Sequence, residues 1–304
     1  MKTLKEICLH AGTLTKKKRI VIASADDELV LKAVSDFIYP DLLLPVLIGD
    51  KVKIREVMEK YRIRFKVAEE IHHVRSVEEA AKLSVEMARK GQADILMKGL
   101  LPTKTFLKEI LNRQTGITAN EILSHIGIFE SPFYKKLIGL TDAAINISPD
   151  VRVKKEIVRN AVNVFKTLGV LTPKVALLAA IERINPKMQA TIDAAELIEL
   201  NRKEHFADCI LEGPVALDVA VSADAAEHKG IKSSIAGSVD ILVVPDIGVG
   251  NVLYKSLTYL GGAKAAGILI GSSVPVVLTS RSDSEESKQY SIALAANLNI
   301  NQIL

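Results

Sequence analysis

The residues with the clearest chemical potential are Ser280 and Arg281, which follow a run of apolar residues at 274–279. We expect that run to be a strand and a helix to begin shortly after Arg281. The first turn of a helix carries free N–H groups and a partial positive charge, and a guanidinium matches phosphate oxygens. The hydroxyl of Ser280 suits a thioester carbonyl or a developing oxyanion. A capping box of Ser282 and Glu285, with Arg281 in a surface ion pair, is the alternative interpretation.

A second candidate is a strand–turn–helix segment that follows the apolar residues 241–245. Glycines in the turn would let the backbone approach a phosphate group closely. The segment is not a full dinucleotide-binding fingerprint, because Leu253 stands where a third glycine is required. A tight turn that binds nothing is the alternative. The candidate substrate-binding residues of this segment are Asp246, Gly248, Gly250, Asn251 and Lys255.

A third candidate lies at the end of the apolar run 95–98, where Lys98 is followed by a glycine. Pro102 is suited to the first turn of a helix. Lys104 and Lys108 would share one face of that helix, since they are four residues apart. The lysines could converge on an anion, and a solvated lysine face is the alternative for the last two. The candidate binding residues here are Lys98, Gly99, Thr103 and Lys104.

Several other kinds of catalytic centre lack their sequence motifs. The six histidines have no metal-ligand spacing, and we expect His72 and His73 to lie in a loop. Neither a Gly-x-Ser-x-Gly nucleophile motif nor a Walker A motif occurs. Cys8 and Cys209 are far apart, which indicates neither a disulfide framework nor a metal site. We therefore expect direct transfer between bound substrates, with no metal and no other cofactor.

Composition indicates a globular protein that acts on a small anion in a reducing cytoplasm. The chain has 304 residues, of which 48% are hydrophobic and 25% charged, and its formal net charge is +4. The dense basic run at 16–19 is expected to be a solvated approach to a strand rather than a nucleic-acid or membrane patch. The N-terminus lacks the pattern of a signal peptide. Glycines and Pro275 interrupt the apolar region 263–278, which favours two buried strands over a membrane span.

Short apolar runs alternate with amphipathic segments along the whole chain, which predicts an α/β fold with a largely parallel sheet. Aromatic residues make up only 4% of the chain, so the core must be aliphatic. Helices are expected at about 77–90, where Ser76 and Glu79 form a capping box, at 251–265 and at 284–298. The expected strands are 20–24, 43–48, 95–98, 126–129, 137–140, 175–179, 241–245, 268–271 and 274–279.

Taken together, the ordered motifs resemble the phosphate acetyl/butyryl transferase family, and most of all its phosphate butyryltransferase branch. The resemblance covers nearly all of the chain from about residue 20. It implies the fold of isocitrate and isopropylmalate dehydrogenases, with two α/β domains and a cleft between them. The implied domains are 1–129 plus 280–304, and 130–279. The matching segments are 97–100, 103–104, 123–125, 140–146, 212–214, 236–237, 245–246, 250–259, 262–264 and 275–284.

The resemblance also implies a reaction: transfer of an acyl group, with butyryl expected, between coenzyme A and inorganic phosphate in a homo-oligomer. Coenzyme A is then a substrate, not a resident cofactor. The family's Ser-Arg pair maps onto Ser280 and Arg281, which implies that Arg281 binds either inorganic phosphate or a phosphate group of coenzyme A. The acetyl branch has an acidic residue where this chain has Ser287. Asp283 is therefore a provisional base, and the identity of the base stays open.

Three other functions are alternatives at this stage. The first is phosphate acetyltransferase, or an acyltransferase that depends on acyl carrier protein. The second is an NAD-dependent decarboxylating dehydrogenase of the same fold, which would need a cluster of metal-binding acids that the sequence does not offer. The third is an acyl-CoA sensor without catalysis. The sequence leaves the length and branching of the acyl chain open.

Overall fold

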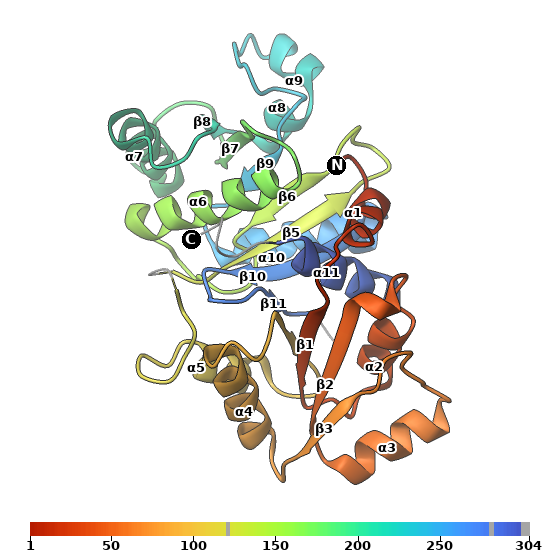
Figure 1. Cartoon of the computed structure of the whole chain (residues 1–304). Helices are drawn as coiled ribbons and strands as arrows, with labels where there is room; N and C mark the ends of the chain where they lie inside the picture. The colour runs from red at the N-terminus through yellow and green to blue at the C-terminus, as the bar shows by residue number, and fades with distance from the viewer. Residues whose placement is uncertain (120–121, 280–282, 299–304) are drawn as a thin grey trace. The chain divides into compact units, whose positions relative to one another are not determined.

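The computed structural model describes residues 1–119, 122–279 and 283–298 of the chain (Figure 1). Backbone contacts divide these residues into two compact units. We call residues 5–123 and 266–298 the β1 unit, and residues 1–4 and 124–265 the β5 unit. The predicted domain boundaries, after residues 129 and 279, stay a prediction.

The β1 unit is a twisted, mostly parallel sheet with helices packed on it. Its strand order is β3-β2-β1-β4-β11-β10, and only β10 and β11 pair antiparallel. The strands are β1 Lys18–Ala23, β2 Leu43–Gly49, β3 Glu70–His73, β4 Ile95–Lys98, β10 Lys264–Ile270 and β11 Val276–Val277. The helices are α1 Leu4–Ala11, α2 Glu28–Ser35, α3 Lys51–Lys60, α4 Val77–Arg89, α5 Thr103–Ile110 and α11 Glu285–Asn297, with a 3-10 turn at Pro40–Leu42.

The β5 unit has the same construction with a different strand order, β5-β6-β9-β7-β8. Only β5 and β6 pair antiparallel. The strands are β5 Ser124–Glu130, β6 Ile138–Thr141, β7 Lys174–Leu178, β8 Ile210–Val215 and β9 Ile241–Val243. The helices are α6 Val151–Thr167, α7 Gln189–Glu204, α8 Leu217–Val221, α9 Ala223–His228 and α10 Ile247–Lys255, which continues as a π-helical turn at Ser256–Leu260.

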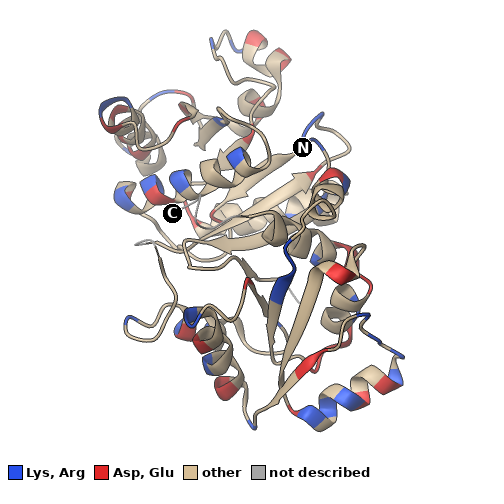
Figure 2. Ribbon diagram, in the orientation of Figure 1, with Lys and Arg blue, Asp and Glu red and all other residues tan. Residues whose placement is uncertain are grey.

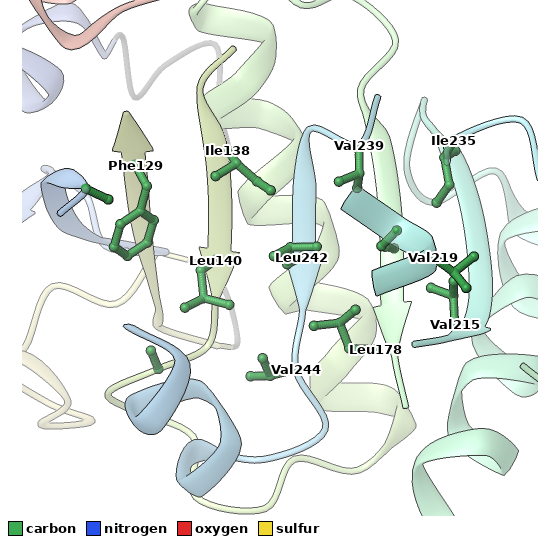
Figure 3. Packing of buried hydrophobic residues seen from close by; sticks show 14 of the residues in the cluster. Phe129, Ile138, Leu140, Leu178, Val215, Val219, Ile235, Val239, Leu242 and Val244 are labelled. Carbon is green, nitrogen blue, oxygen red and sulfur yellow. The ribbon is translucent and has the colours of Figure 1, made fainter. Parts of the chain in front are cut away.

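The core of the β5 unit is aliphatic, as the shortage of aromatic residues predicts (Figure 3). Leu140 and Leu242 come from adjacent strands and are both almost fully buried. Phe129 packs beside them and contacts Tyr254 edge-on, with ring centroids 4.8 Å apart. Burying one such side chain contributes about 1.5–3 kcal/mol to the free energy of unfolding. The cluster therefore fixes the spacing of the strands and of the loops that follow them.

Each of the nine predicted strands has a counterpart, and the largely parallel α/β sheet is confirmed. The strands β3 and β8 were not predicted, and His72 and His73 lie in β3 rather than in a loop. Both strands end the sheet order and are partly exposed along most of their length. An edge strand does not need the continuous apolar run that marks a strand covered on both faces, which explains the omission.

Two predicted helix features need correction. The helix expected at 251–265 begins at Ile247 and ends at Leu260, because Gly262 adopts a φ of +62° and β10 starts at Lys264. The capping residue of α11 is Ser284, whose hydroxyl accepts the N–H of Ser287 at 3.1 Å. Ser282, the residue expected in that role, lies outside the described residues.

Charged residues of both signs are interspersed on the helices, for example along α3 and α4 (Figure 2). One hydrogen bond of the capping box predicted at the start of α4 is confirmed: the Ser76 hydroxyl accepts the N–H of Glu79. Within the described ranges, no helix is both long enough and apolar enough to cross a membrane.

Candidate active site

The carboxyl ends of β4 and β11, with the starts of α2 and α11, enclose a small cavity that we call the strand-end cavity. Its volume is about 10 Å³, roughly the space of one water molecule. In parallel α/β sheets, ligands bind beyond the carboxyl ends of the strands. The cavity is lined by Asp27, Leu29, Val30, Lys98, Gly99, Thr279 and Lys288.

Gly99 brings the end of β4 against the end of β1. Its N–H donates to the carbonyl of Ala23 at 2.8 Å, and the next N–H, of Leu100, donates to Ser24 at 2.7 Å. A Cβ at position 99 would lie 2.0 Å from the Ser24 carbonyl oxygen, so no side chain fits. The lysine–glycine pair singled out in the sequence is therefore a close backbone crossing that turns Lys98 into the cavity.

Lys98 is 5% exposed, which is rare for a lysine. Its ammonium donates to the carbonyl oxygens of Gly99 at 3.1 Å and Leu101 at 3.3 Å. A buried cation needs such partners, because burial without hydrogen bonds costs several kcal/mol. These bonds hold positive charge at the strand end that the sequence predicted as an anion site.

Lys288 is a cavity residue that sequence reasoning missed. It lies in the first turns of α11, is 2% exposed, and donates to the main-chain carbonyl of Asp283 at 2.6 Å. Burial lowers the pKa of its ammonium below the ordinary lysine value, while the carboxylates of Asp283, Asp27 and Glu285 oppose that shift. A signal was present: Lys288 shares the helical spacing of the buried Ser291, Ile292 and Ala295.

The predicted catalytic residues lie next to this cavity in sequence. Ser280 and Arg281 are outside the described residues. Asp283 is described, is half-buried, and contributes its carbonyl to the Lys288 contact. The helix expected shortly after Arg281 begins at Glu285. The strand and the helix predicted on either side of this segment are thus present.

Thr103 and Lys104 begin α5, as predicted, and both are exposed. Pro102 occupies the N-cap position without a side-chain hydrogen bond. Neither Thr103 nor Lys104 lines the strand-end cavity. A solvated start of α5 is what the structure describes, and their substrate-binding role stays a prediction.

The glycine segment of the β5 unit has a different geometry from the expected loop. Asp246 is the N-cap of α10, and its carboxylate accepts the N–H of Val249 at 3.0 Å. Gly248 and Gly250 therefore lie within the helix rather than in a turn before it. A Cβ at Gly250 would lie 2.7 Å from the carbonyl of Asp142, so this glycine permits close packing.

Asn251 and Lys255 are exposed on α10. The Lys255 ammonium lies 5.7 Å from the centroid of the Tyr259 ring, a cation–π geometry. Their role in substrate binding stays a prediction. What the structure establishes is that they are accessible to a ligand from the solvent.

Two larger pockets lie beside α10 at the carboxyl ends of β7 and β9. One, of about 680 Å³, is polar and includes Asp246. The other, of about 660 Å³, is mostly apolar and includes Gly248. They share Met188, Ala190 and Pro245, so they adjoin. The apolar pocket is lined by Leu178, Ala179, Ala180, Met188, Ala190, Leu217, Pro245, Gly248, Val249, Val252, Leu253 and Ser256.

Two motifs of the family resemblance contain an acidic residue that anchors a loop. The buried carboxylate of Asp142 accepts N–H groups of Ala144 at 2.9 Å and Ile145 at 3.0 Å. Glu212 accepts the N–H of Ser234 at 2.9 Å and the hydroxyl of Ser233 at 2.6 Å. Burial would raise the pKa of Glu212, but these hydrogen bonds outweigh it and hold the pKa below its ordinary value. Both acids stabilise loops by accepting their N–H groups.

In residues 1–119, 122–279 and 283–298, no three His, Cys, Asp or Glu side chains gather closely enough to hold a metal ion. The charged residues that line the strand-end cavity are Asp27, Lys98 and Lys288.

Comparison with known proteins matches a family model described as phosphate acetyl/butaryl transferase to residues 3–82 and 62–296. A phosphate butyryltransferase of Clostridium acetobutylicum is 42% identical over 296 residues, covering 97% of this chain and 98% of the relative. A phosphate acetyltransferase of Thermotoga maritima is 40% identical over 281 residues, covering 92% and 95%.

Solved structures agree on the fold. A branched-chain phosphotransacylase from Enterococcus faecalis V583 matches with a TM-score of 0.78 at 37% identity, covering 94% of this chain and 99% of its own. A putative 4-hydroxythreonine-4-phosphate dehydrogenase from Salmonella typhimurium matches with a TM-score of 0.60 at 15% identity, covering 93% and 99%. The second likeness concerns the fold alone, and it is consistent with the predicted dehydrogenase-like α/β architecture.

Proposed function

We propose, because the chain belongs to the phosphate acetyl/butaryl transferase family, that it transfers a short or branched acyl group, butyryl foremost, between coenzyme A and inorganic phosphate. The observation that carries the proposal is the 42% identity to a phosphate butyryltransferase over 97% of the chain. The strand-end cavity adds physical support, since it places a buried lysine where an anionic substrate is expected.

The reaction proceeds by direct attack in a ternary complex. A phosphate oxygen attacks the thioester carbonyl, the new C–O bond forms and the C–S bond breaks. The proton that the attacking hydrogen phosphate gives up balances the departing thiolate, which leaves as the coenzyme A thiol. Holding both substrates together removes the entropy cost of their encounter, which is the main contribution expected without a covalent intermediate.

The chain's own residues divide this work. Arg281 grips phosphate through parallel N–H···O bonds, with Lys98 adding positive charge at the end of β4. Ser280 stabilises charge on the thioester oxygen or the leaving thiolate. Asp283 remains the provisional base for the thiol in the reverse direction. Its main-chain contact to Lys288 supports a fixed position for this segment.

Coenzyme A is the larger substrate, and the β5-unit residues are proposed as its contacts. Gly99, Thr103 and Lys104 are proposed to complete the binding set from the β1 unit. The apolar pocket beside α10 suits an apolar part of acyl-CoA, because such pockets stabilise apolar groups in proportion to buried area. The proposed contacts around α10 are Asp246, Gly248, Gly250, Asn251 and Lys255.

The remaining expectations are proposals as well. We propose two α/β domains with a cleft between them, a homo-oligomer, a cytoplasmic location, and activity without a metal or a resident cofactor. The exposed apolar side chains of Val252, Tyr259 and Leu260, which are 67%, 64% and 87% exposed, support association with another copy. Size measurement by light scattering tests that proposal.

A thiol assay tests the function. Purified protein with butyryl-CoA should release free thiol only when phosphate is added, with EDTA present and NAD absent. Acetyl-CoA provides the comparison with the acetyltransferase alternative. Thiol release without phosphate would identify a thioesterase, and a requirement for NAD would support the dehydrogenase alternative.

A further inference from the structure

A pocket of about 340 Å³ lies in the β1 unit at the amino ends of the strands, and we call it the amino-end pocket. Its walls come from the chain shortly before three neighbouring parallel strands, β1, β2 and β3. Small-molecule sites have volumes of about 300–1,000 Å³, so the pocket has the size of a ligand site. The six residues of β1 place about 16 Å of strand between this pocket and the strand-end cavity. The lining residues that matter here are Gly12, Lys17, Tyr39, Asp41 and Lys66.

The basic run at 16–19 is divided between two environments. Lys16 pairs with Asp94 at 3.5 Å, and Arg19 at the other end of the run pairs with a glutamate of β3 at 3.0 Å. Lys17 lies between them in sequence and lines the amino-end pocket instead. One member of the run is therefore placed at a pocket that the proposed acyl transfer does not use.

Three charged side chains line the amino-end pocket, and all three are exposed to solvent. Lys17 and Lys66 are cations and Asp41 is an anion, so the lining carries a net charge of +1. Within the part of the chain that the structure describes, Asp41 forms an ion pair with neither lysine. Ammonium groups bind phosphate oxygens, and a carboxylate accepts hydrogen bonds from hydroxyl or amino groups. This set suits an anion that also carries hydrogen-bond donors.

Tyr39 supplies an aromatic wall to the pocket. A Cβ at Gly12 would lie 2.3 Å from Cζ of the tyrosine ring and 2.5 Å from both Cε atoms, so the ring packs face-on against the backbone at Gly12. The carbonyl of Tyr39 accepts the N–H of Leu42 at 3.0 Å, which fixes the backbone there as well. A ring held in this way offers a planar surface, and nucleobases stack favourably on such surfaces.

We propose that the amino-end pocket binds a nucleoside phosphate. The base stacks on Tyr39, the phosphate lies between Lys17 and Lys66, and ribose hydroxyls donate to Asp41. Two sources share this chemistry: a free adenine nucleotide, and the adenosine phosphate end of a coenzyme A molecule. The pocket lies at the opposite ends of the strands from the strand-end cavity, so this site is separate from the proposed active site.

Calorimetric titration of the purified protein with AMP measures binding at this site. One AMP should bind per chain, and inorganic phosphate should bind about tenfold or more weakly, because it has no base to stack on Tyr39. Repeating the AMP titration with saturating coenzyme A distinguishes the two sources. Loss of AMP binding would assign the site to the adenosine end of coenzyme A, whereas unchanged binding would assign it to a free nucleotide.

The decisive variants are Lys17→Met and Lys66→Met, which keep the apolar stem and remove one charge each. Each should raise the Kd for AMP about tenfold, as expected for the loss of one charge-assisted contact to phosphate. Lys16→Met is the matched control, because it alters the neighbouring lysine of the same run and removes only a surface ion pair with Asp94. Its Kd for AMP should equal that of the unaltered protein.

Two variants of Tyr39 test the stacking contact. Tyr39→Leu should raise the Kd for AMP about tenfold and leave the Kd for inorganic phosphate unchanged, because only the base uses the ring. Tyr39→Phe keeps the ring and should bind AMP as the unaltered protein does. An equal Kd for AMP in Tyr39→Leu and Tyr39→Phe would overturn the nucleoside part of the proposal.

The other outcomes that would overturn the proposal are equally direct. They are no AMP binding by the unaltered protein, normal AMP binding by both Lys17→Met and Lys66→Met, or a loss in Lys16→Met as large as in Lys17→Met. The last result would assign AMP binding to general basic charge rather than to the pocket. Because the titrations need no turnover, a negative thiol assay would contradict the proposed function and leave this inference standing.

Discussion

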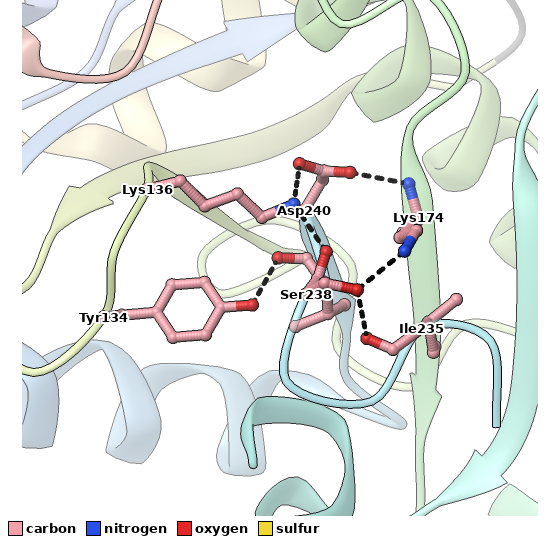
Figure 4. Close-up of polar contacts among 7 residues, drawn as sticks. Tyr134, Lys136, Lys174, Ile235, Ser238 and Asp240 are labelled. Carbon is pink, nitrogen blue, oxygen red and sulfur yellow. Dashed lines mark hydrogen bonds and ion pairs between the residues drawn. The ribbon is translucent and has the colours of Figure 1, made fainter. Parts of the chain in front are cut away.

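Buried charged side chains have different partners at the strand-end cavity of the β1 unit and in a polar network of the β5 unit around Asp240 (Figure 4). In the network, Asp240 is 4% exposed and meets the Lys136 ammonium at 2.6 Å and the Lys174 N–H at 2.8 Å. Opposite charges balance each other there. At the cavity, Lys98 and Lys288 donate to main-chain carbonyl oxygens, and the carboxylates of Asp283, Asp27 and Glu285 act on Lys288 from nearby.

The positions of the two regions explain the difference. Asp240 precedes β9 and Lys174 begins β7, so the network lies at the amino ends of parallel strands. The cavity lies at carboxyl ends, where such sheets bind ligands. Tyr134 and Ser238 complete the network through hydrogen bonds of 2.8 Å and 2.7 Å. The ion-paired network stabilises the fold, whereas the lysines at the strand end lie where we propose that an anionic substrate binds.

The largest effect that this comparison predicts is on activity, at Arg281. Arg281→Lys keeps the charge but loses the planar fork, and should cost about 2–4 kcal/mol in kcat/KM for phosphate, roughly 30- to 1000-fold. Arg281→Ala should be only slightly worse. Near-normal kcat/KM in the lysine variant would remove the bidentate role, and an equal loss of folding stability would make Arg281 a structural residue.

Asp240→Asn should show the opposite pattern, with stability lost and kinetics retained. The amide cannot match the charged hydrogen bonds to Lys136, so unfolding free energy should fall by about 1.5–3 kcal/mol. Urea denaturation measures the change, with kcat/KM for phosphate as the second readout. A stable variant with impaired phosphate kinetics would break the distinction between the two regions.

Acyl-chain length should change kcat/KM for acyl-CoA and leave the KM for phosphate unchanged. Each methylene in a fitting apolar pocket contributes about 1 kcal/mol, so butyryl-CoA or branched acyl-CoA should exceed acetyl-CoA by about tenfold or more in kcat/KM. A panel of acyl-CoAs from two to six carbons measures this. A higher kcat/KM for acetyl-CoA would favour the acetyltransferase alternative.

Glu212 should give the smallest effect, confined to acid pH. Hydrogen bonds hold its pKa below the ordinary glutamate value in the folded chain despite burial, so its stabilisation is present above the unfolded pKa and is lost as pH falls through the folded pKa. Glu212→Gln should therefore flatten the acid limb of a Tm-against-pH curve. At neutral pH its kinetics should be unchanged. A shifted pH optimum of activity would instead place Glu212 in the reaction.

The sequence predicted the parts of the fold that bury continuous apolar runs, such as β1 and β9. It could not predict β3 and β8, because a partly exposed edge strand contains polar residues, as loops do. At the site, Lys98 was found from its position at a strand end. Lys288 was missed, because only the packed face of α11 reveals that a lysine in a charged stretch is buried.

The glycine segment shows a further limit of motif reasoning. Gly250 was interpreted as a means of approaching phosphate, yet in the fold it permits α10 to pack on the Asp142 carbonyl. The spacing of the glycines could not distinguish phosphate binding from close packing, since both roles require a residue without a Cβ. The binding roles of Asp246 and Lys255 accordingly remain predictions, whereas the packing role of Gly250 is explained.

The central claim is that acyl groups move between coenzyme A and phosphate, and detection of the acyl phosphate tests it most directly. Protein incubated with butyryl-CoA and phosphate should form butyryl phosphate in equal amounts with free thiol, measured by phosphorus NMR alongside a thiol reagent. Free thiol accompanied by butyrate, with no acyl phosphate signal at early times, would contradict the claim.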